Sequence, residues 1–437
     1  MPLPNHWAVF NLRSTPFFQD TLRPGDERFP VESLFVGRRR EADRVLRVIG
    51  SGNSSRQAIP GEPGVGKTSL VQYIKSRTEG DGYIAASDPI SLLGDDTADR
   101  LMMRILRYVH DAVLLSPTTA AIAKSEPMQQ ARQLVNAFRS SSRGASLTVL
   151  GFGGGVQTGT AYEQGVFLTP AAIVPGILDQ LIRTAREAGC DLRGVLLHVN
   201  NLENLSEAQA EQAGLVLRDI RDILLIDGYH TLLVGTPESI RATITPHAQL
   251  RSVFQQMEPI GAMGFEDLQA LLRTRYHYLR LDRNADAREP ITAEALEELH
   301  EIFGGDLRGL FLACDQAAAE LVGYLGRDAA TPMTGRDIRT TVGGGYRTEM
   351  RSRVGETNAE YLESLVGLRE EVLTQRALQE HWRVSQGMVS RVVADLQQYG
   401  YLRGVGRAGD RRIRYELTGA ARLILDHLAG VSRDGAS

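Results

Sequence analysis

One stretch of the sequence carries residue types that bind phosphate groups. It runs Gly-Glu-Pro-Gly-Val-Gly-Lys-Thr-Ser and fits the pattern of glycine, four residues, glycine, lysine and serine or threonine. Glycines let consecutive backbone N–H groups point into one concavity, and the helix expected to start near Lys67 adds the positive end of its dipole. Lys67 suits the β- and γ-phosphates, and the Thr68 hydroxyl suits the magnesium ion that accompanies ATP. The sequence therefore predicts a site for ATP and magnesium at Gly61, Glu62, Pro63, Gly64, Val65, Gly66, Lys67, Thr68 and Ser69.

A glycine-rich turn before an ordinary helix is the alternative interpretation of this stretch. The residues after it favour the phosphate loop, because Leu70, Val71 and Tyr73 continue an apolar helical pattern. A short strand at 57–59 is expected to deliver the loop. Further elements follow from apolar periodicity: a strand at 82–86, a helix at 99–114, a glycine-rich hairpin at 147–167, strands at 194–199 and 231–235, and helices from 264 to 326.

Composition limits the class of protein. A chain of 437 residues with 42% hydrophobic content can build two or three domains, each with its own core. We find no apolar run of membrane-spanning length and no signal-peptide pattern, so a cytoplasmic protein without a membrane partner is expected. Cys190 and Cys314 lack the spacing of metal ligands, and free thiols are expected. The net charge of −4 argues against coating of the whole surface by nucleic acid, while a local basic patch remains compatible with it.

Two further motifs suggest a family. Phe-Val-Gly-Arg, with Glu41 three residues after the arginine, precedes the phosphate loop, and Gly-Asp-Leu-Arg ends at Arg308. Both resemble segments of the initiator-type AAA+ ATPases, the group that contains the origin-recognition proteins. The resemblance implies that Arg308, in a helical lid, is the sensor-2 arginine that reaches the bound nucleotide, and that Asp306 caps its helix. It also implies an adenine pocket at Val36, Gly37 and Arg38.

The apolar run at 194–199 ends in an unusual pair of residues. ATPases with a phosphate loop need a strand that ends in aspartate, which helps to hold magnesium, and AAA+ members usually follow it with glutamate as the base. Here the two positions hold Asn200 and Asn201, whose amides carry no charge and accept no proton at neutral pH. Glu203 is a candidate to replace part of the function. We therefore expect a degenerate Walker B motif, with hydrolysis slow or absent, and leave enzymatic activity open.

A second apolar run, 223–227, ends in an acid and competes for this role. It lies too close to the strand at 231–235 to leave room for the helix that separates the two strands in the AAA+ order, so we favour the run that ends at Asn200. Thr236 follows the later strand and has two interpretations of equal weight. It is either the sensor-1 residue of the AAA+ resemblance or the N-cap of a helix that has proline at its first position.

The C-terminal part has the pattern of a winged helix-turn-helix. Two short helices are expected at 374–382 and 386–399, and the second has one apolar face and one face of small or hydrogen-bonding side chains. Such an exposed face suits the DNA major groove. Two β-like segments around an arginine-rich tip then predict a wing that contacts phosphates. A winged helix used for protein contacts is the alternative. The predicted DNA-binding residues are Ser385, Gln386, Ser390, Arg391, Arg407, Arg411 and Arg412.

The sequence thus predicts an α/β fold with an AAA+ parallel-sheet domain, an all-helical lid and a winged helix. The expected function is an ATP-binding switch that controls DNA binding or DNA-associated assembly. Double-stranded DNA, a loaded or recruited protein, and further copies of the chain are the expected partners. A signalling, defence or transcription regulator similar to the STAND ATPases, or an ATPase that recruits a transposase-like partner, are the alternatives. The expected parts are an irregular segment at 1–33, the AAA+ domain at 34–262 with an insert at 90–190, the lid at 263–345 and the winged helix at 346–437. Glycines 343–345 are expected to interrupt the helical pattern between the lid and the winged helix.

Overall fold

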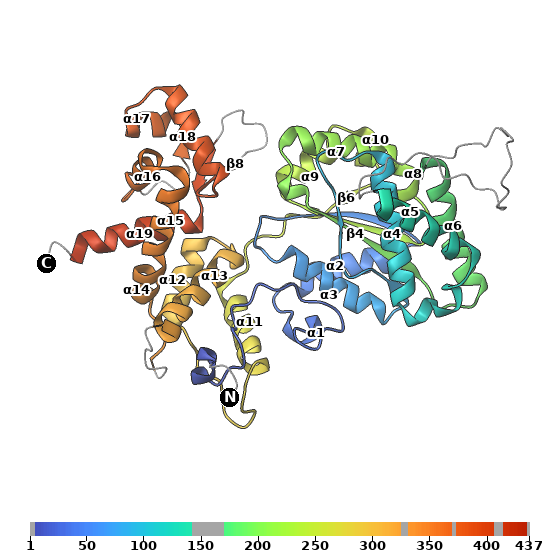
Figure 1. Ribbon diagram of the computed structural model, residues 1–437, viewed down its shortest axis with the longest axis horizontal. Helices are drawn as coiled ribbons and strands as arrows, with labels where there is room; N and C mark the ends of the chain where they lie inside the picture. Colours follow the sequence, from blue (N-terminus) through green and yellow to red (C-terminus); the bar gives the residue numbers. More distant parts are fainter. Residues whose placement is uncertain (1–4, 142–169, 325–330, 369–372, 406–413, 435–437) are drawn as a thin grey trace. The chain divides into compact units, whose positions relative to one another are not determined.

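The computed structural model describes residues 5–141, 170–324, 331–368, 373–405 and 414–434 (Figure 1). They form two compact units. The sheet unit comprises Leu22–Pro63 and Lys67–Ile260, and the helical unit comprises Met1–Thr21, Gly64–Gly66 and Gly261–Ser437. The hairpin predicted at 147–167 lies outside the described residues.

A parallel sheet forms the centre of the sheet unit. Its strand order is β2-β4-β5-β1-β6, with β3 also paired to β4, and every pairing is parallel. This is the AAA+ order, which confirms the predicted fold class. The strands are β1 (Ser55–Pro60), β2 (Tyr83–Ile84), β3 (Ile90–Ser91), β4 (Gly194–Asn200), β5 (Tyr229–Gly235) and β6 (Gln255–Gln256).

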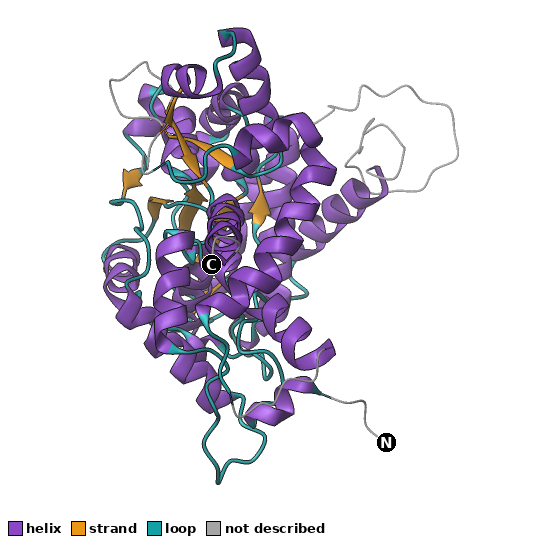
Figure 2. Ribbon diagram, turned by 90° about the vertical axis from the view of Figure 1, so that its left-hand side faces the viewer, coloured by secondary structure: helices purple, strands orange, loops and turns teal. Residues whose placement is uncertain are grey.

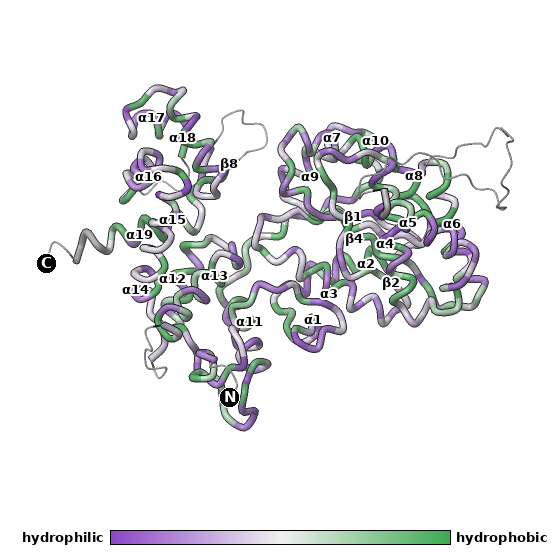
Figure 3. Tube along the Cα trace, viewed as in Figure 1, coloured by the Kyte–Doolittle hydropathy of each residue, from purple (hydrophilic) through white to green (hydrophobic). Residues whose placement is uncertain are grey.

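The central strands form where the sequence is apolar without interruption. All seven residues of β5 and the first six of β4 are buried, as expected for parallel strands covered on both faces, and the tube along β4 is largely hydrophobic (Figure 3). The competing run at 223–227 begins in helix α8 (Arg221–Leu224) and contains no strand. The structure therefore confirms that the run ending at Asn200 is the strand beside β5.

Helices cover the sheet on both faces. Figure 1 draws α2 (Arg39–Gly50) and α3 (Lys67–Glu79) on one side and α7 (Glu207–Asp219) and α9 (Pro237–Ile244) on the other. The predicted helix at 99–114 is α4 (Ala98–Leu115), which buries one face of apolar residues in the core of this unit. The remaining helices of the unit are α1 (Val31–Leu34), α5 (Glu126–Ser141), α6 (Pro170–Glu187) and α10 (Ala248–Arg251).

The helical unit begins with the N-terminal segment up to Thr21, which packs on the lid helices. Arg275 of α11 (Phe265–Tyr278) is buried, and its guanidinium donates to the carbonyls of Pro16 at 2.9 Å and Phe18 at 3.0 Å. The same guanidinium lies 3.9 Å from the Phe18 ring centroid and 4.7 Å from that of Phe311. A buried cation with aromatic and carbonyl contacts therefore joins the first residues to the lid. The other lid helices are α12 (Ala293–Phe303), α13 (Leu307–Ala318) and α14 (Gly335–Ile338).

The glycines at 343–345 do not break the chain, so that prediction was wrong. Helical backbone runs from Arg339–Gly343 directly into α15 (Gly344–Val354). The reason is packing against α19 (Gly419–Asp434). A Cβ atom on Gly343 would lie 2.7 Å from the His427 Cβ and 3.1 Å from the Leu423 carbonyl oxygen, so glycine allows the two helices to approach closely. The domain boundary at residue 345 stays a prediction.

The C-terminal elements confirm the predicted winged helix. After α16 (Glu356–Glu363) come α17 (Gln375–Trp382) and α18 (Gln386–Gln398), which form the helix-turn-helix. The short strands β7 (Leu373–Thr374), β9 (Arg414–Leu417) and β8 (Leu402–Val405) pair antiparallel in that order and are the strands of this unit within the described ranges (Figure 2). Their core includes the apolar side chains predicted to face inward on α18, namely Val389, Val392, Val393 and Leu396.

Candidate functional site

The phosphate loop has the backbone conformation that its glycines allow. It leaves β1 at Pro60, and α3 begins at Lys67. Gly64 has φ 80° and Gly66 has φ 93°, both in the left-handed region that side chains with a Cβ rarely adopt. Because the first N–H groups of a helix have no acceptor within it, the start of α3 offers donors together with the positive end of the helix dipole. The loop can therefore accept an anion.

Lys67 is held over the loop that it follows. The side chain is 6% exposed, and Nζ donates to the carbonyl oxygens of Gly61 at 2.8 Å and Glu62 at 2.9 Å. These two acceptors are uncharged, so phosphate oxygens would bind the ammonium more strongly in their place. Thr68, the predicted magnesium ligand, is exposed at the start of α3, and Ser69 beside it is partly exposed.

Strand register brings the other predicted residues to the edge at which the loop emerges. Pro60 of β1 pairs with Gly235 of β5, and Val199 of β4 pairs with Leu233 of β5. The backbone N–H of Gly61 also donates to the Gly235 carbonyl at 3.0 Å. The carboxyl ends of the three strands therefore lie together, which is where open α/β sheets bind their ligands.

Asn200 and Asn201 lie at this edge, in contrasting conformations. The Oδ1 atom of Asn200 is buried and has no hydrogen-bond partner in the described part of the chain. Asn201 has φ 78° and ψ 11°, in the left-handed region, and its Oδ1 accepts from the Asn204 amide. Asparagine tolerates this conformation better than glutamate does. Glu203 is exposed on the short helix that follows.

Thr236 performs the capping role predicted for it. Its Oγ1 accepts from the Ser239 backbone N–H at 3.1 Å, and Pro237 is the first residue of α9. The hydroxyl also donates to the Ser239 Oγ at 3.0 Å. The cap leaves the sensor-1 interpretation open, because Thr236 follows β5 at the edge where the phosphate loop begins.

The predicted adenine segment lies against the same helix as the phosphate loop. Phe35 stacks on Tyr73 of α3 with ring centroids 4.1 Å apart and an interplanar angle of 11°. Gly37 has φ 90°, and Arg38 is buried with one guanidinium nitrogen 3.3 Å from Glu41 Oε1. Val36 is partly exposed. These contacts fix the turn that leads into α2.

Arg308 belongs to the helical unit and is exposed in the first turn of α13. Asp306 caps that helix as predicted, since its Oδ1 accepts from the backbone N–H groups of Arg308 at 3.1 Å and Gly309 at 3.2 Å. The cap orients the first turn, and the arginine side chain extends from it.

The winged helix presents most of its predicted polar face to solvent. Ser385 caps α18, its Oγ accepting from the Met388 N–H at 3.4 Å, and Gln386, Ser390 and Arg391 are exposed. Ser390 also accepts from the Gln375 amide at 2.8 Å, which joins the two helices of the motif. The wing-tip residues Arg407, Arg411 and Arg412 lie outside the described residues.

Sequence reasoning missed Arg383, in the turn between the two helices. This exposed arginine ends α17 with φ 54° and ψ 41°, a conformation that usually selects glycine or asparagine. It lines a surface pocket with Arg376, Gln379, Glu380 and Val384, which belong to α17 and the turn. No signal in the sequence identified Arg383, because arginine is not a residue that favours the left-handed conformation.

Two kinds of feature are absent from the described residues. No group of three or more histidine, cysteine, aspartate or glutamate side chains there is arranged to hold a metal ion. Nor does any helix in the described ranges combine the length and apolar character that crossing a membrane requires.

Comparisons with known proteins find likeness in structure and none in sequence. No protein-family model matches the chain, and no curated protein matches it. The Aeropyrum pernix ORC1 protein in complex with DNA is 14% identical, with 92% of this chain and 95% of that chain covered and a TM-score of 0.44. The A. pernix ORC2 protein in ADPNP–ADP complexes is 15% identical, with 97% and 98% covered and a TM-score of 0.45. Drosophila ORC bound to DNA is 12% identical, with 98% and 94% covered and a TM-score of 0.40. The similarity extends over nearly the whole chain, but identities and scores this low transfer no residue role.

Proposed function

We propose that this chain is an ATP-binding switch that controls DNA binding, or DNA-associated assembly, through its winged helix. The observation that carries the proposal is the Lys67 ammonium, buried at the start of α3 and held by two uncharged carbonyls of the loop. Left-handed glycines and the start of α3 surround the same position. This arrangement suits the phosphates of a nucleotide.

The nucleotide would be held by the phosphate loop and by the segment before α2. Backbone N–H groups of residues 64–69 and the Lys67 ammonium would bind the phosphates, while Val36, Gly37 and Arg38 would contact the adenine. Thr68 would supply a hydroxyl ligand for magnesium. Bound Mg·ATP supplies a negative charge that the free loop lacks. The chain's own residues bind and orient that charge.

We propose slow or absent hydrolysis because the sheet edge beside the loop holds amides. Asn200 replaces the carboxylate that helps to hold magnesium, and Asn201 replaces the base. Glu203 is the acid nearest to them in the sequence, and it is exposed and offset by two residues from the expected base. A protein that binds ATP and seldom cleaves it can remain in its bound state, which suits a switch.

The output of the switch is proposed to be the winged helix. Arg308 would contact the bound nucleotide, so that occupancy of the loop sets the position of the lid that carries α18. On α18, Ser385, Gln386, Ser390 and Arg391 would face the DNA major groove, and the wing arginines would contact phosphates. Further copies of the chain, or a recruited protein, would assemble on that DNA.

Equilibrium binding with a fluorescent ATP analogue tests the nucleotide site. Lys67→Ala should weaken binding by about a hundredfold, because charge-assisted bonds to phosphate contribute about 1.5 to 3 kcal/mol each. Lys124→Ala is the matched control, since Lys124 is an exposed lysine away from the loop, and its affinity should equal that of the wild type. Equal affinity in both variants would exclude the loop as the site.

Binding of double-stranded DNA with and without ATP tests the switch. Wild-type affinity should change on addition of Mg·ATP, and the Lys67→Ala variant should show no such change. If ATP binds the wild type but leaves DNA affinity unaltered, the nucleotide site stands and the switch is refuted. Titration at two salt concentrations separates phosphate contacts, which weaken with salt, from base contacts.

A further inference from the structure

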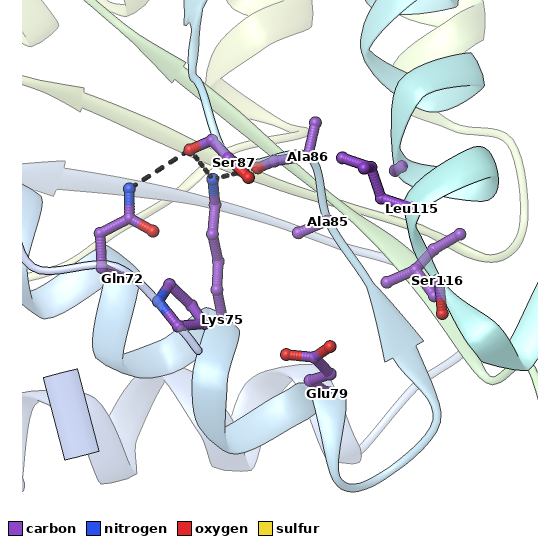
Figure 4. Close-up of a pocket in the computed structure, with 11 residues that line it drawn as sticks. Gln72, Lys75, Glu79, Ala85, Ala86, Ser87, Leu115 and Ser116 are labelled. Carbon is purple, nitrogen blue, oxygen red and sulfur yellow. Dashed lines mark hydrogen bonds between the residues drawn. The ribbon is translucent and has the colours of Figure 1, made fainter. Parts of the chain in front are cut away.

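A cavity lies along α3, in the sheet unit and beyond the phosphate loop. Its volume is about 120 Å³, and it lies between α3, the segment that follows β2 and the end of α4 (Figure 4). Gln72, Lys75 and Glu79 line it from α3, and Ala85, Leu115 and Ser116 line it from the other two elements. None of the residues to which we assign nucleotide or DNA contacts belongs to this lining.

Lys75 is the reactive group of this cavity. Its side chain is 4% exposed, and Nζ donates to the carbonyl oxygens of Ala86 at 2.7 Å and Ser87 at 3.3 Å (Figure 4). Within the described ranges, Lys75 forms no salt bridge with a carboxylate, and its Nζ lies 5.6 Å from the Tyr108 ring centroid. The amine is thus shielded from water, and the carbonyl groups bind it without supplying a negative charge to balance its own.

These surroundings shift the amine toward its neutral form. Burial lowers the pKa of Lys75 to about 7, with Asp88 opposing the shift and Arg23 adding to it. The nearby imidazole of His198 is itself buried, and both burial and the Lys75 charge lower its pKa, so it remains uncharged at neutral pH. Glu79 is the acid on the cavity wall. A desolvated lysine of this kind is a nucleophile at neutral pH.

We propose that Lys75 is an acylation site and that the cavity receives a short acyl group from a small activated donor, such as an acyl phosphate. The amine lone pair attacks the carbonyl carbon, and a C–N bond forms. The C–O bond to phosphate then breaks, phosphate leaves with the electron pair, and the nitrogen loses one proton to water. The product is an uncharged amide on α3.

The geometry accommodates that product. A single water needs about 10 to 15 Å³ on this measure of volume, so a cavity of about 120 Å³ has room for an acetyl group. The amide retains one N–H, which can keep the bond to the Ala86 carbonyl. Acylation also removes a positive charge from a site without a counter-ion, and the modified protein therefore avoids the cost of burying an ammonium.

Rates of acetylation by acetyl phosphate, mapped by mass spectrometry on the folded full chain, test the proposal. The chain has only three lysines, Lys67, Lys75 and Lys124, so every site can be followed. At pH 7 an ordinary lysine amine is neutral about once in 2,500 molecules. An amine of lower pKa is also a weaker nucleophile, and we take the dependence known for thiols. On chemical reactivity alone, Lys75 should then react about 40-fold faster than exposed Lys124.

The expected result is faster acetylation of Lys75 than of Lys124 at pH 7, with a Lys75 rate that levels off above its pKa while the Lys124 rate keeps rising. Ala85→Leu should fill the cavity and slow Lys75 alone, whereas Ala270→Leu, at a half-buried alanine of α11, should leave both rates unchanged. A Lys75 rate at or below that of Lys124 at pH 7, or modification of Lys75 only after denaturation, overturns the proposal. Saturating ATP should protect Lys67 without affecting Lys75, which separates this test from that of the nucleotide site.

Discussion

The substitution Asn200→Asp restores the carboxylate whose absence underlies the proposed lack of turnover. The Oδ1 atom that it would charge is buried and has no hydrogen-bond partner in the described part of the chain. An unpaired buried polar group costs about 1 to 3 kcal/mol, and a charged one costs more. Without nucleotide we therefore expect the variant to unfold at a lower urea concentration than the wild type, with a free energy of unfolding that is lower by at least about 1 kcal/mol.

Magnesium and ATP should reverse this loss. A ligand that binds only the folded state stabilises it in proportion to its affinity, and the new carboxylate gives magnesium a charged ligand beside the loop. Urea unfolding in Mg·ATP, compared with ATP and a chelator, should therefore show a larger difference for Asn200→Asp than for the wild type. Asn53→Asp, at an exposed asparagine between α2 and β1, is the matched control and should behave as the wild type does.

Restoring the base is harder, because Asn201 adopts φ 78°. Glutamate in the left-handed region costs about 1 kcal/mol or more, so Asn201→Glu should destabilise the protein even as it raises phosphate release in the Asn200→Asp background. Wild-type turnover on the scale of ordinary enzymes, about 1 s⁻¹ or faster, would refute our interpretation of this edge. So would an Asn200→Asp variant whose stability shows no added dependence on magnesium.

Three further predictions concern other parts of the molecule. Arg391→Ala should weaken DNA binding by about 1 to 3 kcal/mol if the side chain reads a base, and unchanged affinity in a titration would place the contact elsewhere. Glu363→Gln should destabilise the winged helix at neutral pH. Burial raises the pKa of Glu363, but hydrogen bonds from Arg351 and Arg347 outweigh it and lower the pKa from 4.5 to about 2. The ionised carboxylate therefore stabilises the folded state above pH 4.5, and this contribution is lost as pH falls toward 2. The urea midpoints of variant and wild type should converge at that low pH. Lys75→Met should remove a rise in stability with pH, because lysine in the unfolded chain keeps a proton that the folded protein releases above about pH 7. The free energy of unfolding of the wild type minus that of the variant should increase by about 2 kcal/mol between pH 7 and pH 9. A difference that does not change with pH would contradict a neutral amine at Lys75.

The sequence predicted the elements whose signals are local. Uninterrupted apolar residues identified β4 and β5, and the predicted caps at Thr236 and Asp306 lie where short polar side chains precede helical patterns. The glycines at 343–345 were misjudged because their partner, α19, lies more than seventy residues later in the chain. From the local sequence alone, three consecutive glycines indicate a flexible segment. In the structure they are helical, and they allow a helix from a distant part of the chain to approach closely.

The environment of Lys75 was equally beyond local reasoning. On an isolated α3 a lysine eight residues after Lys67 would be assigned to solvent, because charged residues seldom lie fully inside. It is buried because the segment between β2 and β3 leaves the sheet there and covers it, with Ala86 and Ser87 turning their carbonyls toward Nζ. The conformation of Arg383 was also hidden, since sequence alone does not show which residue of a turn adopts positive φ.

The proposed nucleotide site has groups that can bind phosphate but lacks the acids that would support cleavage. At the sheet edge the structure supplies donors in the loop and in Lys67, while Asn200 and Asn201 supply no acid to hold magnesium or to remove a proton. Under the proposed function, ATP would bind at this edge and seldom be cleaved there. The proposed switch would then convert nucleotide binding into a lasting change of lid position, and its reversal would depend on dissociation of the nucleotide. The rate at which DNA affinity returns after ATP is diluted should then match the rate of ATP release, and a return that follows phosphate release instead would show that the amides do not prevent catalysis.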